Sequence, residues 1–267
     1  MPTLTRPRND PAQYDDLVGE WWDPFGTFAM LHWIAEARAR LVPPATRPGA
    51  LLVDLGCGGG LLAPHVARLG YTHVGLDLTR SALLVATDHG VLGAQADASA
   101  LPLPTGIADV VACGELLEHT PAPAAVVREA CRILRPGGTL VVDTIAATAL
   151  ARFVVVWLAE RVPGAAPPGL HDPALFVDRA ELRRAAAAGG VHLHLTGLRP
   201  SLLASIGWLT RRHATARMVP SRFTSVLFQC RDEHPHQRRH QHRHQQHRHR
   251  EQHQHRQLDR HQLDRHQ

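Results

Sequence analysis

The stretch Val53-Asp54-Leu55-Gly56-Cys57-Gly58-Gly59-Gly60 decides the fold of this chain. It continues the apolar run Ala50–Asp54 and opens into a cluster of glycines. A short apolar run that ends in a tight glycine turn is typical of a buried parallel strand. Gly56 and Gly58 give a Gly-x-Gly spacing, in which backbone without side chains lets a ligand approach closely. The stretch therefore predicts a strand, a turn that faces a ligand, and the start of a helix.

Strand-like and helix-like segments alternate after this turn. The expected strands are Thr72–Asp77, Val91–Gln95, Asp109–Cys113 and Thr139–Thr144, and the helices between them are Leu61–Leu69, Ser81–Asp88 and Pro123–Leu134. A later helix, Asp178–Ala188 with Asp178 as its N-cap, is flanked by the strands Val191–Thr196 and Thr224–Gln229. Alternation at this spacing predicts βαβ units and a mostly parallel sheet.

The remaining segments divide the chain into three expected regions. Helical patterns around residues 14–22 and 28–41 predict an N-terminal helical cap over residues 1–45. The alternating region spans residues 46–233, within which residues 146–178 and 198–221 break the pattern and are expected to cover the substrate. A tail of different composition follows over residues 234–267.

The charge of the chain is concentrated in this tail. The formal net charge is +5, yet residues 1–233 carry 21 Arg and 21 acidic residues. The last 34 residues contain eight Arg against three acids, with eleven His and nine Gln. We expect the tail to be disordered, because so few apolar side chains cannot offset the entropy of ordering it. Because the net charge of residues 1–233 is zero, we expect that nucleic acid is not a partner.

Composition excludes several other classes of function. The 267 residues contain no Lys, which excludes Schiff-base chemistry and a P-loop. The four Cys residues show no Cys-x-x-Cys spacing, so we expect neither a zinc ribbon nor a disulfide framework. No apolar run approaches the roughly 18 residues that a membrane span needs. The polar N-terminus has no signal-peptide core, so we expect a cytoplasmic location.

An acidic residue ends the second expected strand. Asp77 comes 21 residues after Gly56, where a carboxylate can accept hydrogen bonds from both ribose hydroxyls of a nucleoside. A nicotinamide-dinucleotide fold uses the same two features, but Leu61 stands at its third glycine position. Asp54, directly before the turn, is also atypical of that fold and suits a ligand that carries an ammonium group.

Several ordered motifs extend this pattern between residues 14 and 230. They are Glu20-Trp21-Trp22-Asp23, Val53–Gly60, Gly75-Leu76-Asp77, Cys113–Pro121, Arg135-Pro136-Gly137-Gly138 and Gly169-Leu170-His171-Asp172. Together they resemble class I S-adenosylmethionine-dependent methyltransferases and, more narrowly, the ubiquinone-biosynthesis O-methyltransferase family. The resemblance implies an α/β fold with a Rossmann-like, mostly parallel, seven-stranded sheet and helices on both faces. It also implies methyl transfer to a phenolic, catechol or quinol hydroxyl, such as that of a prenylated quinone precursor.

The resemblance carries over to individual cofactor-binding positions. It places the methionine portion of S-adenosylmethionine beside Asp54 and Gly56 and the ribose on Asp77, and it makes Gly58 a further cofactor-binding position. It also implies that Asp97 faces the adenine edge and that Gly114 lines the cofactor pocket. Arg38 would pair with the methionine carboxylate.

The segment Glu115-Leu116-Leu117-Glu118-His119 follows the fourth expected strand. Glu115 and Glu118 are three residues apart and can converge on one face of a helical turn. Two carboxylates and an imidazole make a reasonable site for a divalent cation, and the resembling family implies Mg²⁺ or Zn²⁺ at these positions. In the alternative, no metal is needed, and His119, with Glu118 beside it, acts as a general base on the phenolic proton.

Partners and competing functions stay open at this point. The expected partner is a small phenol or quinol, and His171-Asp172 either reaches it or forms a turn. Apolar Ala146–Ala159 and Leu198–Pro220, which contains Trp208 and two arginines, are compatible with peripheral contact at the inner face of the membrane. The alternatives are a C- or N-methyltransferase of a small secondary metabolite, or a non-catalytic nucleotide- or metal-binding protein built around the tail.

Overall fold

The computed structural model describes residues 7–161 and 166–232. The predicted disorder of residues 234–267 falls outside the described residues. The part of the chain up to Asp232 forms one compact unit. The N-terminal helices expected to form a cap pack on the sheet within this unit, with Trp21 and Phe28 in one hydrophobic cluster with Leu61 and Ala82.

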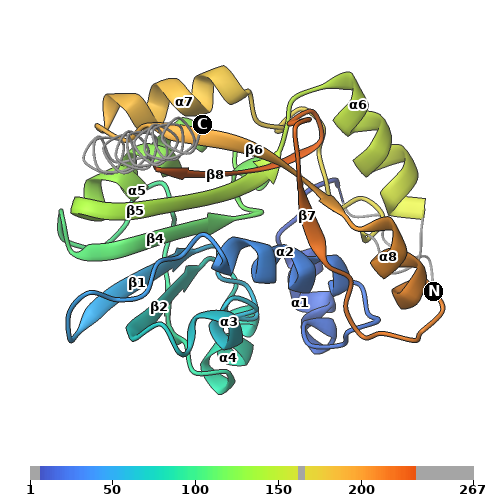
Figure 1. Ribbon diagram of the computed structural model, residues 1–267, viewed down its shortest axis with the longest axis horizontal. Coiled ribbons are helices and arrows are strands. Elements are labelled where there is room, and N and C mark those ends of the chain that lie inside the picture. The colour runs from blue at the N-terminus through green and yellow to red at the C-terminus, as the bar shows by residue number, and fades with distance from the viewer. Residues whose placement is uncertain (1–6, 162–165, 233–267) are drawn as a thin grey trace, which may run out of the picture. The chain divides into compact units, whose positions relative to one another are not determined.

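One mixed sheet forms the centre of the unit (Figure 1). Its strands are β1 (Ala50–Leu55), β2 (Tyr71–Asp77), β3 (Leu92–Gln95), β4 (Ala108–Gly114), β5 (Leu134–Ile145), β6 (Leu193–Pro200), β7 (Met218–Ser221) and β8 (Leu227–Asp232). They lie in the order β3-β2-β1-β4-β5-β8-β6-β7. The first five are mutually parallel, whereas β8 is antiparallel to both β5 and β6, and β7 is antiparallel to β6.

The expected fold class is confirmed, but the sheet has eight strands among the described residues and not seven. The additional strand, β7, forms in residues 198–221, which were expected to be cover. Its residues Met218–Ser221 pair with Gly197–Pro200, so the end of this segment extends the sheet. Met218 is buried in a hydrophobic cluster, which explains why so short an edge strand is held in place.

The helices and helical turns join these strands. They are α1 (Ala12–Asp16), α2 (Ala29–Ala39), α3 (Ala63–Val66), α4 (Arg80–Asp88), α5 (Pro123–Ile133), α6 (Ala149–Ala151), α7 (Arg179–Ala188) and α8 (Leu202–Leu209), with 3₁₀ turns η1 (Val18–Glu20), η2 (Leu117–His119) and η4 (Ala159–Arg161) and the π-helical η3 (Arg152–Leu158). Asp178 caps α7 as predicted, because its Oδ1 accepts from the amides of Ala180 and Glu181 at 2.8 Å. The expected helix over residues 61–69 is shorter than predicted.

Both faces of the central strands of the sheet are buried. Alternate residues of β1 and β4, such as Val53 and Val111, pack in the cluster that contains the buried side chains of α5 and α7. The residues between them, such as Leu52 and Val110, pack against α2 and α3. This arrangement of helices on both faces is expected for a parallel sheet made of continuous apolar strands.

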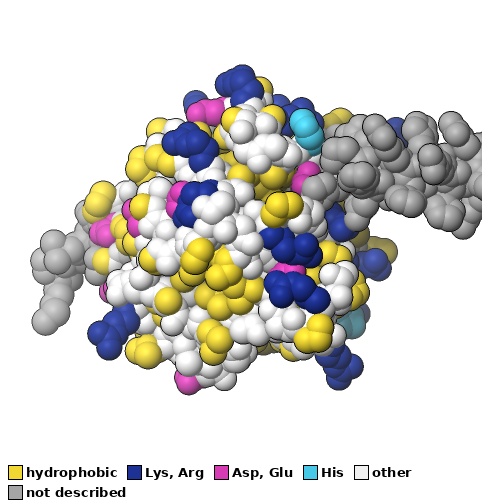
Figure 2. All heavy atoms as spheres, turned by 90° about the vertical axis from the view of Figure 1, so that its left-hand side faces the viewer, with side chains coloured by type: hydrophobic (Ala, Val, Ile, Leu, Met, Phe, Trp, Pro, Cys, Tyr) yellow, Lys and Arg dark blue, Asp and Glu magenta, His cyan; other side chains and the backbone are white. Residues whose placement is uncertain are grey.

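The sheet order reverses between β1 and β4, because the chain runs outward from β1 to β3 and then returns to β4. In open α/β sheets, ligands bind outside the carboxyl ends of the strands at such a point. None of the described helices has the length and hydrophobicity needed to cross a membrane. The face in Figure 2 carries arginines scattered among acidic and apolar side chains without a continuous basic surface.

Candidate cofactor and active site

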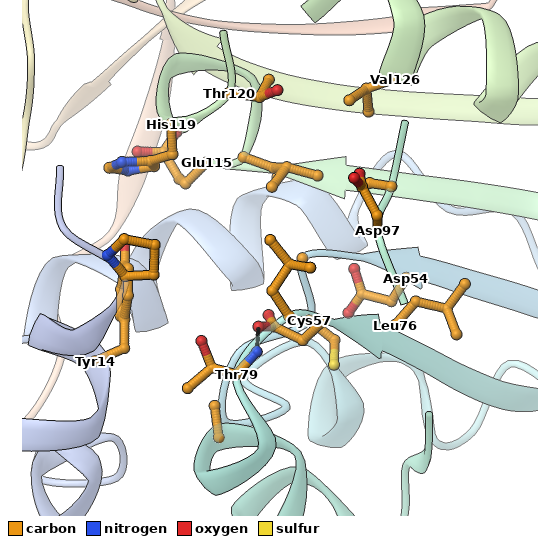
Figure 3. Close-up of a pocket in the computed structure, with 18 of the residues that line it drawn as sticks. Tyr14, Asp54, Cys57, Leu76, Thr79, Asp97, Glu115, His119, Thr120 and Val126 are labelled. Carbon is orange, nitrogen blue, oxygen red and sulfur yellow. Dashed lines mark hydrogen bonds between the residues drawn. The ribbon is translucent and has the colours of Figure 1, made fainter. Parts of the chain in front are cut away.

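A cavity of about 300 Å³ opens at the carboxyl ends of β1, β2 and β4. Figure 3 shows Tyr14, Glu115 and His119 at one end of it and Asp97 at the other. Eight of the predicted site residues line it: Arg38, Asp54, Gly56, Asp77, Asp97, Gly114, Glu115 and His119. The two others, Gly58 and Glu118, are not among the lining residues.

The glycine turn is held against β2 and the N-terminal segment. Gly56 and Gly58 have φ angles of +66° and +50°, the left-handed region that favours glycine. A Cβ added to Gly58 would lie 2.5 Å from Cη2 of Trp21, and one added to Gly59 would lie 2.6 Å from Cγ of the same ring. Trp22 Nε1 donates to the carbonyl of Gly59 at 3.0 Å. Gly58 therefore contacts Trp21, and Gly56 provides the backbone that faces the cavity.

Asp77 closes the turn from the end of β2. Its Oδ2 accepts from the Gly58 amide at 2.9 Å, and its Oδ1 accepts from the Thr79 amide at 2.8 Å. Burial raises the pKa of Asp77, and these two amide bonds act against that rise. Because each carboxylate oxygen has two lone pairs, both oxygens keep acceptor capacity for the hydroxyls of a sugar. The carboxylate is thus oriented before any ligand binds.

Two further carboxylates are set along the same crevice. Asp54 is buried at the end of β1, and its Oδ1 has no hydrogen-bond partner. An unsatisfied buried acceptor costs free energy, which an ammonium group in the cavity would recover. Asp97 uses its Oδ1 to accept from the amide and the hydroxyl of Ser99, both at 2.7 Å, and these bonds lower its pKa.

Arg38 makes a contact that the sequence did not predict. Its Nε and Nη2 donate to Oδ2 and Oδ1 of Asp143 in β5 at 2.6 and 2.8 Å, and both side chains are buried. The guanidinium lies against Gly114, where an added Cβ would be 1.7 Å from Cζ of Arg38. Arg38 lines the cavity as expected, but a carboxylate of this chain holds two of its nitrogens. The one sequence feature that could have pointed to Asp143 is its position near the carboxyl end of β5, at the same edge of the sheet as the cavity.

Buried carboxylates outnumber the cation at this edge. Asp54, Glu115 and Asp143 all interact electrostatically with Arg38. Burial, followed by the charges of Glu118 and Asp143, raises the pKa of Glu115 well above its usual value. Burial also raises the pKa of Glu118 to about 7. A cationic ligand would stabilise the charged forms of these carboxyl groups, whereas an anionic ligand would raise their pKa values further.

The three predicted metal ligands are not brought together as one site. Glu118 is fully buried, and its Oε2 accepts from the Thr144 hydroxyl at 2.7 Å, while Nδ1 of His119 lies 2.6 Å from Oδ1 of Asn9. Over residues 7–161 and 166–232, no group of three or more His, Cys, Asp or Glu side chains is placed to hold a metal ion. Glu115 and Glu118 each retain one buried oxygen, Oε1, without a partner.

His119 lines one end of the cavity with a neutral imidazole. Burial, with His171 adding to its effect, lowers the pKa of His119 to about 3. The His171 ring lies 5.4 Å from it, and Tyr14 approaches it edge-on at 6.2 Å. The sequence singled out His171, but it placed Tyr14 only on a helix and missed Asn9. Neither residue stands near the ELLEH motif in the chain, so only the fold could bring them there.

Comparison with known proteins agrees with this geometry. A family model described as "Methyltransferase domain" matches residues 53–142. The chain is 38% identical over 199 residues to a protein of Thiobacillus denitrificans named "Ubiquinone biosynthesis O-methyltransferase". The aligned region covers 70% of this chain and 84% of that protein. A protein of the same name from Ralstonia nicotianae is 38% identical over 204 residues, with 71% and 84% covered.

Solved structures share the fold at low sequence identity. A SAM-dependent methyltransferase of Thermotoga maritima, described as a possible histamine N-methyltransferase, is 17% identical with a TM-score of 0.54 over 82% of this chain and 95% of that one. Magnesium protoporphyrin IX methyltransferase of Synechocystis, solved with S-adenosylhomocysteine, is 18% identical with a TM-score of 0.55 over 83% and 94%. These two comparisons show the fold alone.

Each of these relatives and solved structures is described as a methyltransferase. A dehydrogenase or a non-catalytic binding protein is not favoured by any of them. The predicted resemblance is therefore confirmed: the chain belongs to the family of ubiquinone biosynthesis O-methyltransferases and is an S-adenosylmethionine-dependent methyltransferase.

Proposed function

We propose that this enzyme methylates a hydroxyl of a phenol or quinol that is a precursor of a prenylated quinone. The observation that carries the proposal is the 38% identity to relatives named for O-methylation in ubiquinone biosynthesis, over 84% of their length. A neutral imidazole in the cavity fits this acceptor, because a phenol must lose its proton as it is methylated. Carbon and nitrogen acceptors also lose a proton, so the distinction from C- or N-methylation rests on the relatives.

The residues of the crevice fit the cofactor. Asp77 would hold the ribose, Asp54 the ammonium group, and Asp97 the adenine edge. Gly56 and Gly114 would allow close approach of the backbone. The bound cofactor supplies a methyl group already activated on a sulfonium, so the protein has to position the acceptor in line and receive its proton.

We propose that His119 accepts the proton that the substrate hydroxyl loses. It lines the cavity, whereas Glu118 is buried behind it and bonded to Thr144. A neutral imidazole has one nitrogen lone pair with which to accept a proton. Glu118 is not among the residues that line the cavity, so we do not assign it a contact with the acceptor.

A divalent cation fits part of this site. Mg²⁺ commonly uses only one or two carboxylates and keeps several waters, so a three-residue cluster is not required for it. The unpartnered Oε1 atoms of Glu115 and Glu118 are hard oxygen donors of the kind that Mg²⁺ prefers. A bound cation would make a hydroxyl easier to deprotonate. We therefore propose Glu115 and Glu118, without His119, as its ligands.

The cation proposal predicts a change in stability as well as in activity. Removal of divalent ions with a chelator should lower the melting temperature of the enzyme by several degrees, and added Mg²⁺ should restore it, because the cation binds the folded state only. Glu115→Gln should show no such shift. A melting temperature that responds to Mg²⁺ equally in both proteins, or in neither, would contradict the proposal.

A methyl-transfer assay tests the proposed function directly. Catechols, prenylated phenols and reduced naphthoquinones are offered with isotope-labelled S-adenosylmethionine, and the position of the label in the product is determined. We expect label on an oxygen of at least one prenylated quinol or phenol. Label on carbon or nitrogen, or binding of S-adenosylhomocysteine without transfer to any hydroxyl, would count against it.

An apolar surface on one side of the molecule supports peripheral membrane contact, which a prenylated substrate would require. The surface consists of exposed side chains of α6 and η3, with Phe153 and Trp157, and of α8, where Leu202 and Leu203 are 74% and 84% exposed. Both helical segments pack on the same hydrophobic cluster and lie at the right of Figure 1. Trp208, expected at this surface, is only 7% exposed, because its Nε1 donates to the Pro24 carbonyl and its ring packs on Trp33.

Cationic side chains accompany this surface. Arg211 and Arg212 are exposed directly after α8, and Arg161 follows η3. Arginines beside apolar side chains suit a membrane surface with anionic lipids. We propose that α8 inserts its leucines among the lipids while these arginines contact the headgroups.

Replacing Leu202 and Leu203 with Ser should lower binding to vesicles that contain anionic lipid by at least about tenfold, since burial of each leucine contributes roughly 1.5–3 kcal/mol. Co-sedimentation with vesicles measures the bound fraction. Leu84→Ser, on α4 and 62% exposed, is the matched control and should leave binding unchanged. Equal loss in both variants would contradict a specific role for α8.

A further inference from the structure

We infer that Asn9 is a positioning residue that fixes the tautomer of His119. Two hydrogen bonds connect the same two residues. The Asn9 Nδ2 donates to the backbone carbonyl of His119 at 2.9 Å, and the Asn9 Oδ1 lies 2.6 Å from Nδ1 of the His119 ring. The inference rests on the proposed role of His119 and adds the residue that prepares it.

The first of these bonds determines the second. A carbonyl oxygen accepts only, so the amide nitrogen of Asn9 must face the His119 carbonyl. The amide oxygen therefore faces the ring, and an oxygen that cannot donate obliges Nδ1 to carry the hydrogen. A neutral imidazole has one N–H, and its other nitrogen is then an acceptor. Nε2 is left with its lone pair, and among the described residues it has no hydrogen-bond partner.

The backbone of Asn9 places its side chain in this position. Its φ is +59°, a left-handed conformation that Asn adopts more readily than most residues. The Asn9 amide donates to the Gly169 carbonyl at 3.2 Å. Asn9 thus has contacts on two sides, to His119 through its side chain and to Gly169 through its backbone.

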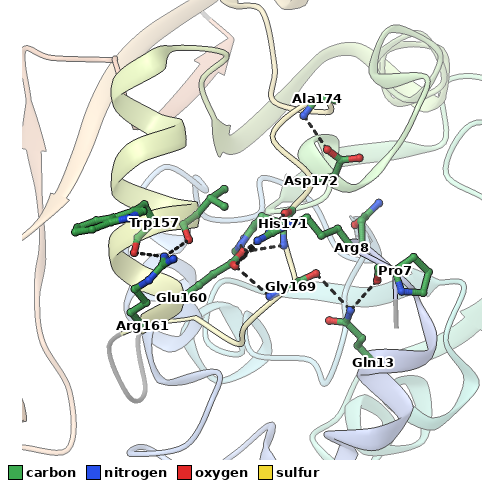
Figure 4. A network of polar contacts seen from close by, with 12 residues as sticks. Pro7, Arg8, Gln13, Trp157, Glu160, Arg161, Gly169, His171, Asp172 and Ala174 are labelled. Atoms are coloured by element: carbon green, nitrogen blue, oxygen red, sulfur yellow. Dashed lines mark hydrogen bonds and ion pairs between the residues drawn. The ribbon is translucent and has the colours of Figure 1, made fainter. Parts of the chain in front are cut away.

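Asn9 belongs to residues 7–13, a segment that we call the strap. Polar contacts of its neighbours hold the strap in place (Figure 4). Arg8 Nη1 and Nη2 donate to the carboxylate of Glu160 at 3.0 and 3.1 Å, and Arg8 Nη1 also donates to the His171 carbonyl at 2.6 Å. Gln13 Nε2 donates to the Gly169 carbonyl at 3.3 Å. Glu160 is buried and accepts from the Gly169 amide at 3.1 Å. Because these bonds order the strap, Asn9 meets His119 at little further entropic cost.

A lone pair on Nε2 allows His119 to act as the base in the proposed methylation of a hydroxyl. Nδ1 is occupied by Asn9, so only Nε2 can accept the proton of a hydroxyl that enters the cavity lined by His119. In the opposite tautomer, Nε2 would present a hydrogen to that hydroxyl and could not act as its base. Asn9 also lines the cavity, but the role that we infer for it is to act through His119.

The test combines a tautomer measurement with kinetics. The full-length chain, labelled with ¹⁵N in its histidines, is studied by NMR at about pH 8, where an imidazole is neutral, and His119→Gln identifies the His119 signals. We expect the hydrogen on Nδ1 in the natural protein and in Asn9→Asp, which keeps an acceptor and tolerates the left-handed backbone. Asn9→Gly also tolerates that backbone but removes the side chain, and it should lose this preference.

We expect the turnover rate to fall in a variant whose His119 no longer prefers the hydrogen on Nδ1. The kcat of Asn9→Gly should fall roughly 10- to 100-fold, as for other residues that orient a functional histidine, with the KM for S-adenosylmethionine within about threefold. Asn9→Asp should recover much of the loss. A hydrogen on Nε2 in the natural protein, or an unchanged tautomer in Asn9→Gly, overturns the inference even if the enzyme methylates a phenol. The expected tautomer without any methyl transfer would instead reject the proposed function.

Discussion

Gly114→Ala should abolish binding of S-adenosylhomocysteine and lower the free energy of unfolding by about 3–5 kcal/mol, the usual cost of breaking a buried ion pair. The new Cβ would lie 1.7 Å from Cζ and 1.8 Å from Nη2 of Arg38. The guanidinium cannot move away without giving up its two bonds to Asp143. Since Arg38 and Gly114 both line the cavity, the displacement also reaches the cofactor site.

Urea unfolding and calorimetric titration with S-adenosylhomocysteine measure the two effects. Gly19→Ala is a suitable control, because no atom lies within 4 Å of its added Cβ and its φ is not positive. Its stability should stay within about 0.5 kcal/mol of that of the natural protein. If Gly114→Ala were as stable as this control and bound the ligand normally, the close packing of Arg38 on β4 would be refuted.

Asp77→Ala should weaken binding of S-adenosylhomocysteine by at least about 100-fold, because it removes two hydrogen bonds to a charged acceptor, each contributing roughly 1.5–3 kcal/mol. The substitution also frees the Gly58 and Thr79 amides that the carboxylate now holds. The glycine turn should lose part of its order in consequence. Isothermal titration calorimetry gives the dissociation constant of each variant.

Asp77→Asn separates these two contributions. The amide keeps the shape and one acceptor oxygen but loses the charge and half of the acceptor capacity. Its binding should fall between that of the natural protein and that of Asp77→Ala. A dissociation constant within about threefold of the natural value in Asp77→Ala would mean that the ribose is held elsewhere.

The sequence predicted the parallel half of the sheet and most of the residues that share one cavity, for a local physical reason. Apolar runs such as Ala50–Leu55 form strands because they are buried on both faces, and Asp54 and Asp77 occupy the ends of neighbouring strands. Chain positions that share one edge of a parallel sheet can be read from strand order alone. Hence eight of the ten predicted site residues line a single cavity.

The contacts that the sequence missed are all long-range side-chain contacts. Arg38 and Asp143 are 105 residues apart, and Asn9 and His119 are 110 residues apart. No spacing rule links such positions, because the partner of a polar group depends on which helix covers which strand end. The expected three-residue metal cluster failed for the same reason, since Thr144 and Asn9 hold Glu118 and His119 in different places.

The packing of Trp21 on Gly58 and Gly59 makes the cofactor turn depend on the N-terminal region. The indole occupies the space beside both glycines, and Trp22 reaches the Gly59 carbonyl across 37 residues of chain. A shortened protein that begins at β1 would retain every residue of the matched domain model. It would lack the indole that packs against Gly58 and Gly59. We therefore expect the smallest part of this enzyme that folds on its own to be larger than the matched residues 53–142 and to include the two tryptophans upstream.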